Sequence, residues 1–124
     1  MTRLLVIKNN YEFSSVFKRG KFSSARTVTV SYKKTSRPAV RYGVTVGKKS
    51  GGAVVRNRLK RLLREAWRSY AEQVQVRGYD LIFVAKTAGG LPSYREIHRD
   101  MGKVLQRIGL LTPGREHNKF EKEA

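Results

Sequence analysis

The strongest hydrophobic pattern of the chain lies in its middle third and has the period of an α-helix. Its apolar positions recur three or four residues apart, as the buried face of an amphipathic helix requires. They are Leu59, Leu62, Leu63, Ala66, Trp67, Tyr70 and Val74. The pattern predicts a long helix over roughly residues 54–75 that packs this stripe on a core, and Gly78 is expected to close it.

Two shorter helices are predicted on either side of this central one. Asn9, followed three residues later by Glu12, indicates an N-terminal capping box, and Gly20 indicates the end of that helix. Ser93 and Glu96 indicate a second capping box, at the start of a last helix. The apolar faces are Phe13, Val16 and Phe17 in the first helix, and Ile97, Met101, Val104, Leu105 and Ile108 in the last.

Three segments have the pattern of strands. Residues 26–34 alternate between apolar and polar positions, and residues 40–46 form a second strand, which we expect to pair back antiparallel across a turn at 35–38. Residues 79–85 are nearly all apolar, which predicts a central strand buried on both faces. The alternation of the first strand places Val28, Val30 and Tyr32 on one side.

These elements predict one α+β domain without repeats or internal linkers. The chain has 124 residues, of which 40% are hydrophobic and 10% aromatic, enough for one modest core. We assign residues 1–111 to the domain and expect residues 112–124, which are polar and of mixed charge, to form a flexible tail.

The charge balance indicates a polyanionic partner. There are 27 Lys and Arg residues against 9 Asp and Glu, giving a net charge of +18. Such an excess on a folded domain is typical of nucleic-acid binding. An anionic membrane is the competing partner, but the chain has no lipidation signal and its central helix uses its apolar face for packing. We therefore expect no membrane association.

The residues needed for autonomous catalysis are missing from the sequence. There is no cysteine, and the two histidines, His98 and His117, have no serine or acidic partner nearby in the sequence. No pair of acids has the spacing that would hold a divalent ion. From these absences we expect no cofactor and no catalytic residue in this chain. The apolar run at residues 4–7 is too short for a signal peptide, so we expect a cytoplasmic protein.

The central helix carries the most informative cluster of cations. At about 100° per residue, Asn57, Arg61, Arg64 and Arg68 share the face opposite the apolar stripe, and Arg58 and Lys60 flank them. A merely solvated face is the alternative, but exposed helices ordinarily mix charges of both signs. Guanidinium groups suit bidentate contact with phosphate, so the pattern favours a surface that binds a polyanion.

Two further features of the sequence are candidate ligand sites. The segment Gly43-x-x-x-Gly47-Lys48-Lys49-Ser50 superficially resembles a phosphate-binding loop, but it lacks the required spacing, and no metal-binding acid follows it. We expect instead that Lys48, Lys49 and backbone amides bind phosphates of a nucleic-acid chain, and that there is no small-molecule substrate. Phe13 and Phe17 either belong to the core or stack on an unpaired base.

Four segments of the chain have the order and spacing of motifs from one known protein family. The segment Ala53-Val-Val-Arg-Asn-Arg-Leu-Lys-Arg-Leu-Leu-Arg-Glu-Ala is similar to the signature helix of that family. Tyr42-Gly-Val-Thr-Val-Gly-Lys-Lys resembles the strand and loop that precede it. Phe13-x-x-Val-Phe-Lys-x-Gly20 resembles the first helix, and Asp80-Leu-Ile-Phe-Val-Ala85 a later strand. From about Leu4 to Leu111 the chain thus resembles the protein component of bacterial ribonuclease P.

The resemblance implies a two-layer α+β sandwich, in which a small mixed sheet packs with three helices through a left-handed βαβ crossover, as in a ribosomal-protein domain. It also implies that the partner is a catalytic RNA that holds Mg²⁺ itself, and that the substrate is precursor tRNA. The residues expected to meet the catalytic RNA are Arg56, Asn57, Arg58, Lys60, Arg61, Arg64 and Arg68. Those expected to meet the single-stranded 5′ leader are Phe13, Phe17, Lys48 and Lys49.

One departure from the family pattern concerns the first long strand. Some members carry an aromatic residue there that faces the leader, whereas this chain has Ser31 at that position and Tyr32 next to it. A shift of one residue reverses the face of a strand, so Tyr32 faces either the core or the leader.

The alternative functions are a ribosomal or general RNA-binding protein on the same scaffold, a basic DNA-associated protein, and an autonomous nuclease.

Overall fold

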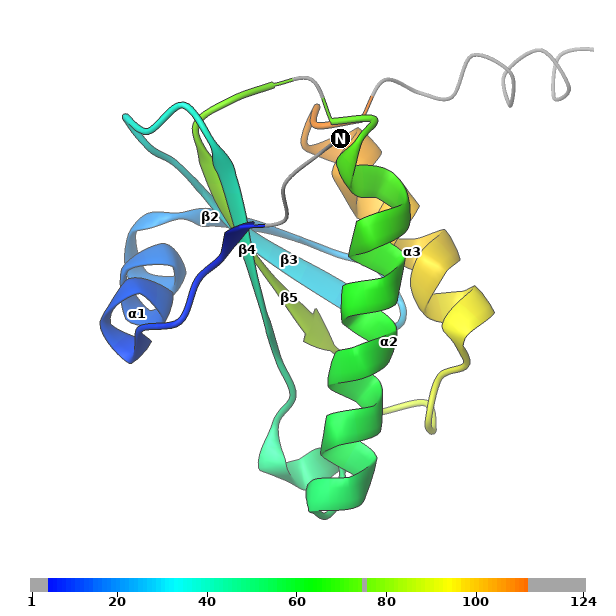
Figure 1. Ribbon diagram of the computed structural model, residues 1–124. Helices are drawn as coiled ribbons and strands as arrows, with labels where there is room; N and C mark the ends of the chain where they lie inside the picture. The colour runs from blue at the N-terminus through cyan, green and yellow to red at the C-terminus, as the bar shows by residue number, and fades with distance from the viewer. Residues whose placement is uncertain (1–4, 75, 112–124) are drawn as a thin grey trace, which may run out of the picture.

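The structure, a computed structural model, describes residues 5–74 and 76–111 of the chain. Within these residues five strands form one mixed sheet with helices on both faces (Figure 1). The strands are β1 (Leu5–Val6), β2 (Lys21–Ser24), β3 (Val28–Lys34), β4 (Val40–Thr45) and β5 (Tyr79–Ala85), and their order in the sheet is β1-β4-β5-β3-β2. The helices are α1 (Asn10–Arg19), a 3₁₀ turn η1 (Lys48–Ser50), α2 (Ala53–Ala71) and α3 (Tyr94–Arg107). The tail predicted for residues 112–124 lies outside the described residues.

Strand β5 is the centre of the sheet, as its apolar sequence predicted. It pairs parallel with β4 on one side and antiparallel with β3 on the other. The prediction that β4 pairs directly with β3 is therefore wrong. The short loop between them allowed a hairpin, but β5, which is apolar on both faces, enters between them after α2 carries the chain across the sheet.

Gly78 lies just before β5 and does not end the central helix, contrary to the prediction. Helix α2 stops at Ala71, where Gln73 and Val74 donate to carbonyls three residues back, so the predicted end near residue 75 was too late. Gly78 has a φ of 76° and lies against the loop between β3 and β4, where a Cβ atom would be 2.8 Å from the Thr35 carbonyl oxygen. The missing side chain of Gly78 lets the start of β5 pack directly against the loop between β3 and β4.

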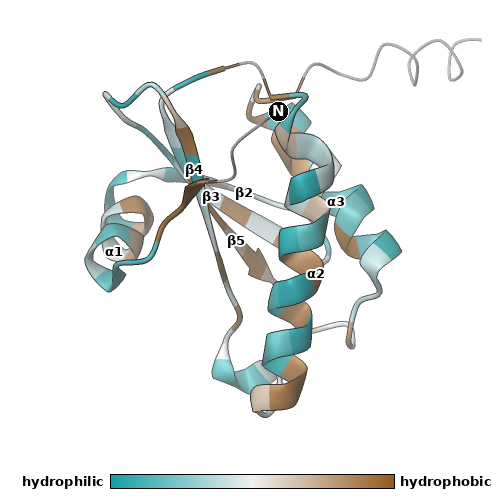
Figure 2. Ribbon diagram, in the orientation of Figure 1, coloured by the Kyte–Doolittle hydropathy of each residue, from teal (hydrophilic) through white to brown (hydrophobic). Residues whose placement is uncertain are grey.

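The core lies mainly between the sheet and the pair α2–α3. Leu81 and Phe83 of β5 face these helices, and the predicted stripe of α2 is buried against them. Helix α2 packs on β4 and β5, and α3 packs on β3 and β2. In Figure 2 strand β5 is apolar, whereas α2 alternates between hydrophilic and hydrophobic bands.

Helix α1 covers the opposite face of the sheet, so the α+β domain has one small layer more than the expected two (Figure 1). Val16 of α1 packs there with Ile7 and Ile82 in a second, smaller core. Tyr32 packs with the main core on the α2–α3 side, whereas Ser31 belongs to the α1 side. Of the two orientations left open by the sequence, Tyr32 therefore has the one that faces the core.

The two predicted capping boxes differ in outcome. At α3 the Glu96 amide donates to Ser93 Oγ at 3.2 Å and the Ser93 amide donates to Glu96 Oε1 at 2.9 Å, which confirms the prediction. At α1 the Asn9 side chain makes no capping bond, and its amide instead donates to Glu12. The other oxygen of Glu12 is paired with Arg41 at 3.0 Å, so the carboxylate is engaged by side chains instead of by the backbone amide of Asn9.

Candidate nucleic-acid interface

The cations predicted on the central helix form one exposed surface, which we call the α2 cationic face. Asn57, Arg58, Arg61, Arg64 and Arg68 are exposed, and Lys60 is half-buried. Opposite them the apolar stripe is buried, so packing fixes which way this face points. In the part of the chain that the structure describes, none of these cations forms an ion pair; the pairs there involve only Glu12, Asp80 and Asp100 as acids.

Arg56 differs from the other members of the predicted set. Its Nε donates to the Gly51 carbonyl oxygen at 3.1 Å, and the side chain is half-buried. The bond closes the turn from η1 into α2 and so fixes the first turn of the cationic face. The remaining donors of the guanidinium are still available to a ligand.

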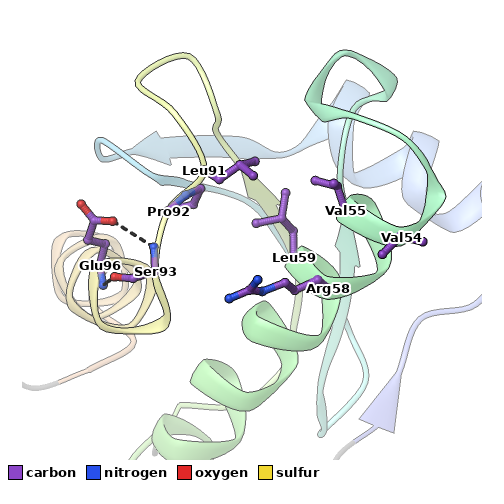
Figure 3. Close-up of a pocket in the computed structure, with 8 residues that line it drawn as sticks. All are labelled: Val54, Val55, Arg58, Leu59, Leu91, Pro92, Ser93 and Glu96. Atoms are coloured by element: carbon purple, nitrogen blue, oxygen red, sulfur yellow. Dashed lines mark hydrogen bonds between the residues drawn. The ribbon is translucent and has the colours of Figure 1, made fainter.

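Arg58 borders a pocket of about 440 Å³ that sequence reasoning did not identify (Figure 3). The pocket lies between the first turns of α2 and the segment that enters α3. Two of its walls, Val54 and Leu91, are apolar side chains that remain largely exposed. The lining residues are Val54, Val55, Arg58, Leu59, Leu91, Pro92, Ser93 and Glu96. An apolar hollow therefore adjoins the α2 cationic face.

On the other side of the sheet, the two phenylalanines of α1 have different environments. Their rings meet edge to face with centroids 6.5 Å apart. Phe13 is half-buried and lies over Gly43, where an added Cβ would come within 2.6 Å of the Phe13 ring. Phe17 is 47% exposed. Phe13 is thus mainly a packing residue, whereas Phe17 presents half of its ring to solvent.

The sheet surface beside these rings carries hydroxyl groups and lysines, and we call it the α1-side surface. Ser24 Oγ lies 2.8 Å from Thr29 Oγ1, and Lys86 Nζ donates to Ser24 Oγ at 3.0 Å. Lys86, which sequence reasoning missed, follows β5, just as η1 with Lys48 and Lys49 follows β4. Parallel strands end at the same edge of a sheet, and a 2.9 Å contact between Ser50 Oγ and Thr87 Oγ1 joins the two segments.

An ion-pair network holds α1 in place over the sheet. Arg41 Nε donates to Asp80 Oδ1 at 3.0 Å and Nη2 donates to Asp80 Oδ2 at 2.8 Å, while Nη1 reaches Glu12 of α1 at 3.0 Å. The hydrogen bonds to Asp80 raise the pKa of Arg41, so the guanidinium is charged at any ordinary pH. Lys33 Nζ adds a bond to Ser15 Oγ at 2.8 Å. Two of the nine acids therefore serve to dock α1.

His98 has a packing role between α2 and α3. Its ring stacks on Tyr70 with centroids 4.5 Å apart, and its Nε2 lies 2.9 Å from Ser69 Oγ. Burial lowers the pKa of His98.

Among residues 5–74 and 76–111 there is no group of three histidine, cysteine or acidic side chains that could hold a metal. None of the described helices has the length and apolar character needed to span a bilayer.

Comparisons with known proteins connect this geometry to a family. The family model for ribonuclease P matches residues 1–109. The ribonuclease P protein component of Clostridium kluyveri is 43% identical over 106 residues, covering 84% of this chain and 94% of that protein. The corresponding protein of Natranaerobius thermophilus is 33% identical, covering 90% and 96%.

Solved structures have the same fold. The RNase P protein of Staphylococcus aureus superposes with a TM-score of 0.77 at 25% identity, covering 89% of this chain and 100% of that chain. The protein of Thermotoga maritima superposes with a TM-score of 0.72 at 24% identity, covering 85% and 97%, a likeness of fold. The family match along nearly the whole domain, the similarity to these relatives and the shared fold show that the chain belongs to the family of ribonuclease P protein components.

Proposed function

We propose that this protein is the RNA-binding subunit of a ribonuclease P ribonucleoprotein and supports maturation of the 5′ end of tRNA in the cytoplasm. In this role it binds two RNAs: the catalytic RNA subunit and the 5′ leader of precursor tRNA. The observation that carries the proposal is that the segments resembling the family's motifs place exposed cations on α2, on one side of the sheet, and the half-exposed Phe17 of α1 on the other, while Lys48 and Lys49 lie in η1 at the entrance to α2.

The α2 cationic face is the proposed contact with the catalytic RNA. Its arginines and lysine stand on a helix whose opposite face is buried, and they have no acidic partner among the described residues, so their repulsion remains uncompensated until a polyanion binds. Each phosphate that they contact releases counterions and strengthens association at low salt. The residues assigned to this contact are Arg56, Asn57, Arg58, Lys60, Arg61, Arg64 and Arg68.

The α1-side surface is the proposed contact with the leader. A single strand needs cations for its phosphates and flat side chains for its bases. Lys48, Lys49 and Lys86 supply the cations, and the half-exposed ring of Phe17 supplies a stacking face. Phe13 supports Phe17 through the edge-to-face contact. Only a precursor carries a leader, so this surface distinguishes substrate from product.

The chemical step belongs to the RNA in this proposal. The protein contributes no catalytic residue, and the Mg²⁺ that the reaction requires is held by the RNA partner. The cations of the protein neutralise phosphates that otherwise require metal ions, so they lower the Mg²⁺ concentration at which the complex assembles. Glu12 of α1 and Asp80 of β5 are already engaged by Arg41.

Reconstitution with the catalytic RNA of ribonuclease P tests the proposal. At a Mg²⁺ concentration at which the RNA alone is inactive, adding the protein should restore 5′ cleavage of precursor tRNA, while the protein alone should cleave nothing. Cleavage by the protein alone would favour the autonomous nuclease. Binding of the RNA without any restored cleavage would favour a general RNA-binding protein.

A further inference from the structure

Phe22, on the edge strand β2, is the most exposed phenylalanine among the described residues and lies outside the surfaces described above. It is 72% exposed, although a phenylalanine gains from being removed from water. No other ring of the described residues stacks on it. Its neighbour Lys21 pairs with Tyr32 and so points to the other face of the sheet. Phe22 is therefore an apolar ring open to solvent at the edge of the sheet.

Strand register places Phe22 on the α1 side of the sheet. Phe22 pairs with Ser31, Ser31 pairs with Ile82, and Ile82 pairs with Gly43. Paired residues on neighbouring strands point to the same face, and Ile82 packs beneath α1. The row thus runs straight across the sheet, with Phe13 lying over Gly43 at one end and Phe22 at the other.

Helix α1 crosses the sheet in the direction of this row. Its first turn is tied to β4 and β5 by the pairing of Glu12 with Arg41, and its end at Gly20 touches the Tyr32 carbonyl oxygen of β3. Phe17, one turn after Phe13, lies toward that end. The order across the sheet is therefore Phe13, Phe17 and then Phe22, with the outermost ring at the edge strand.

We propose that Phe22 stacks on a leader nucleotide, extending the binding surface for single-stranded RNA beyond Phe17 to the edge of the sheet. The inference rests on the proposed function. Helix α2, the proposed contact with the catalytic RNA, packs on the β4 side of the sheet. A leader that leaves the catalytic RNA on that side crosses from Phe13 toward β2. Phe22 then meets a nucleotide farther from the cleavage site than the one at Phe17.

A set of precursors with leaders of increasing length tests this order. The assembled ribonucleoprotein is prepared with wild-type protein, Phe22→Ala, Phe17→Ala and the control Tyr11→Ala, and its affinity for each precursor and for mature tRNA is measured. Tyr11 is also an exposed aromatic, but it lies about 200° around α1 from Phe13. The loss of one base–aromatic stack corresponds to roughly tenfold in affinity.

We expect Phe22→Ala to weaken binding about tenfold for long leaders and to have no effect on short leaders or mature tRNA. Phe17→Ala should already weaken binding at leader lengths at which Phe22→Ala has no effect. Tyr11→Ala should bind every precursor as wild type does. Phe22→Trp, which keeps an aromatic ring, should bind long leaders as tightly as wild type. An effect of Phe22→Ala that is absent at every length, or equal with and without a leader, would overturn the inference. Failure of the wild-type complex to prefer precursor over mature tRNA would instead contradict the proposed function.

Discussion

Asp100 is the most buried charged residue among those described, with 1% of its surface exposed. It accepts hydrogen bonds from the Thr27 amide at 3.0 Å, Thr27 Oγ1 at 2.7 Å and Arg99 Nε at 3.1 Å. Burial by itself would raise the pKa of Asp100, but these hydrogen bonds outweigh it and lower the pKa. The group ties α3 to the start of β3.

This lowered pKa predicts how stability depends on pH. An aspartate in the unfolded chain has a pKa of about 3.9, and the folded state keeps the Asp100 carboxylate ionised to a lower pH. The stabilisation is therefore fully present above the unfolded pKa and is lost as the pH falls through the folded pKa. Asp100→Asn should lower the free energy of unfolding by about 1–2 kcal/mol at neutral pH and reduce its fall in acid. Urea unfolding at several pH values measures both effects, with the exposed Glu65→Gln as control. An unchanged acid dependence would contradict this role.

The contrast between Phe13 and Phe17 gives a second prediction at the level of residues. Phe17→Ala should cost about 1 kcal/mol of stability or less because half of the ring is already exposed, and it should reduce the preference for precursor over mature tRNA several-fold. Phe13→Ala should cost about 3 kcal/mol because the ring packs over Gly43. Thermal unfolding and the ratio of the two affinities separate these outcomes. A large stability loss with an unchanged ratio would show that Phe17 is only a packing residue.

Among the elements, α2 combines a buried apolar face with an exposed cationic face, which is the proposed contact with the catalytic RNA. Replacing Arg61 and Arg64 with alanine should leave stability within about 0.5 kcal/mol, since both side chains are exposed. The double variant should bind the catalytic RNA more weakly, and each lost phosphate contact should reduce the salt slope of binding by about one unit. Removing the exposed Lys34 and Lys103 is the matched control. Equal slopes for the two variants would argue against a specific RNA contact at α2.

Elements with a strong period of their own were predictable from the sequence, and their pairing was not. The stripe of α2, the capping box at Ser93 and the central position of β5 follow from local patterns. The partner of β4 depends on a strand that is more than thirty residues later in the chain, so local alternation carries no information about it. The placement of Lys86 and Phe22 on the α1 side likewise depends on how distant strands pair.

At the scale of the whole molecule, the sheet separates two basic surfaces. The α2 cationic face lies on one side and the α1-side surface on the other, as Figure 1 shows for the helices that carry them. In the proposed function, a catalytic RNA and a leader are therefore bound at the same time without competing for the same residues.

The most direct test compares two variants in two binding measurements. Arg61→Ala with Arg64→Ala should weaken assembly with the catalytic RNA and, once the complex is saturated, leave the ratio of precursor to mature tRNA affinity unchanged. Phe17→Ala should leave assembly unchanged and lower that ratio several-fold. If either variant changed both quantities in proportion while remaining folded, the two surfaces would not act separately, and the assignment of one RNA to each face of the sheet would be wrong.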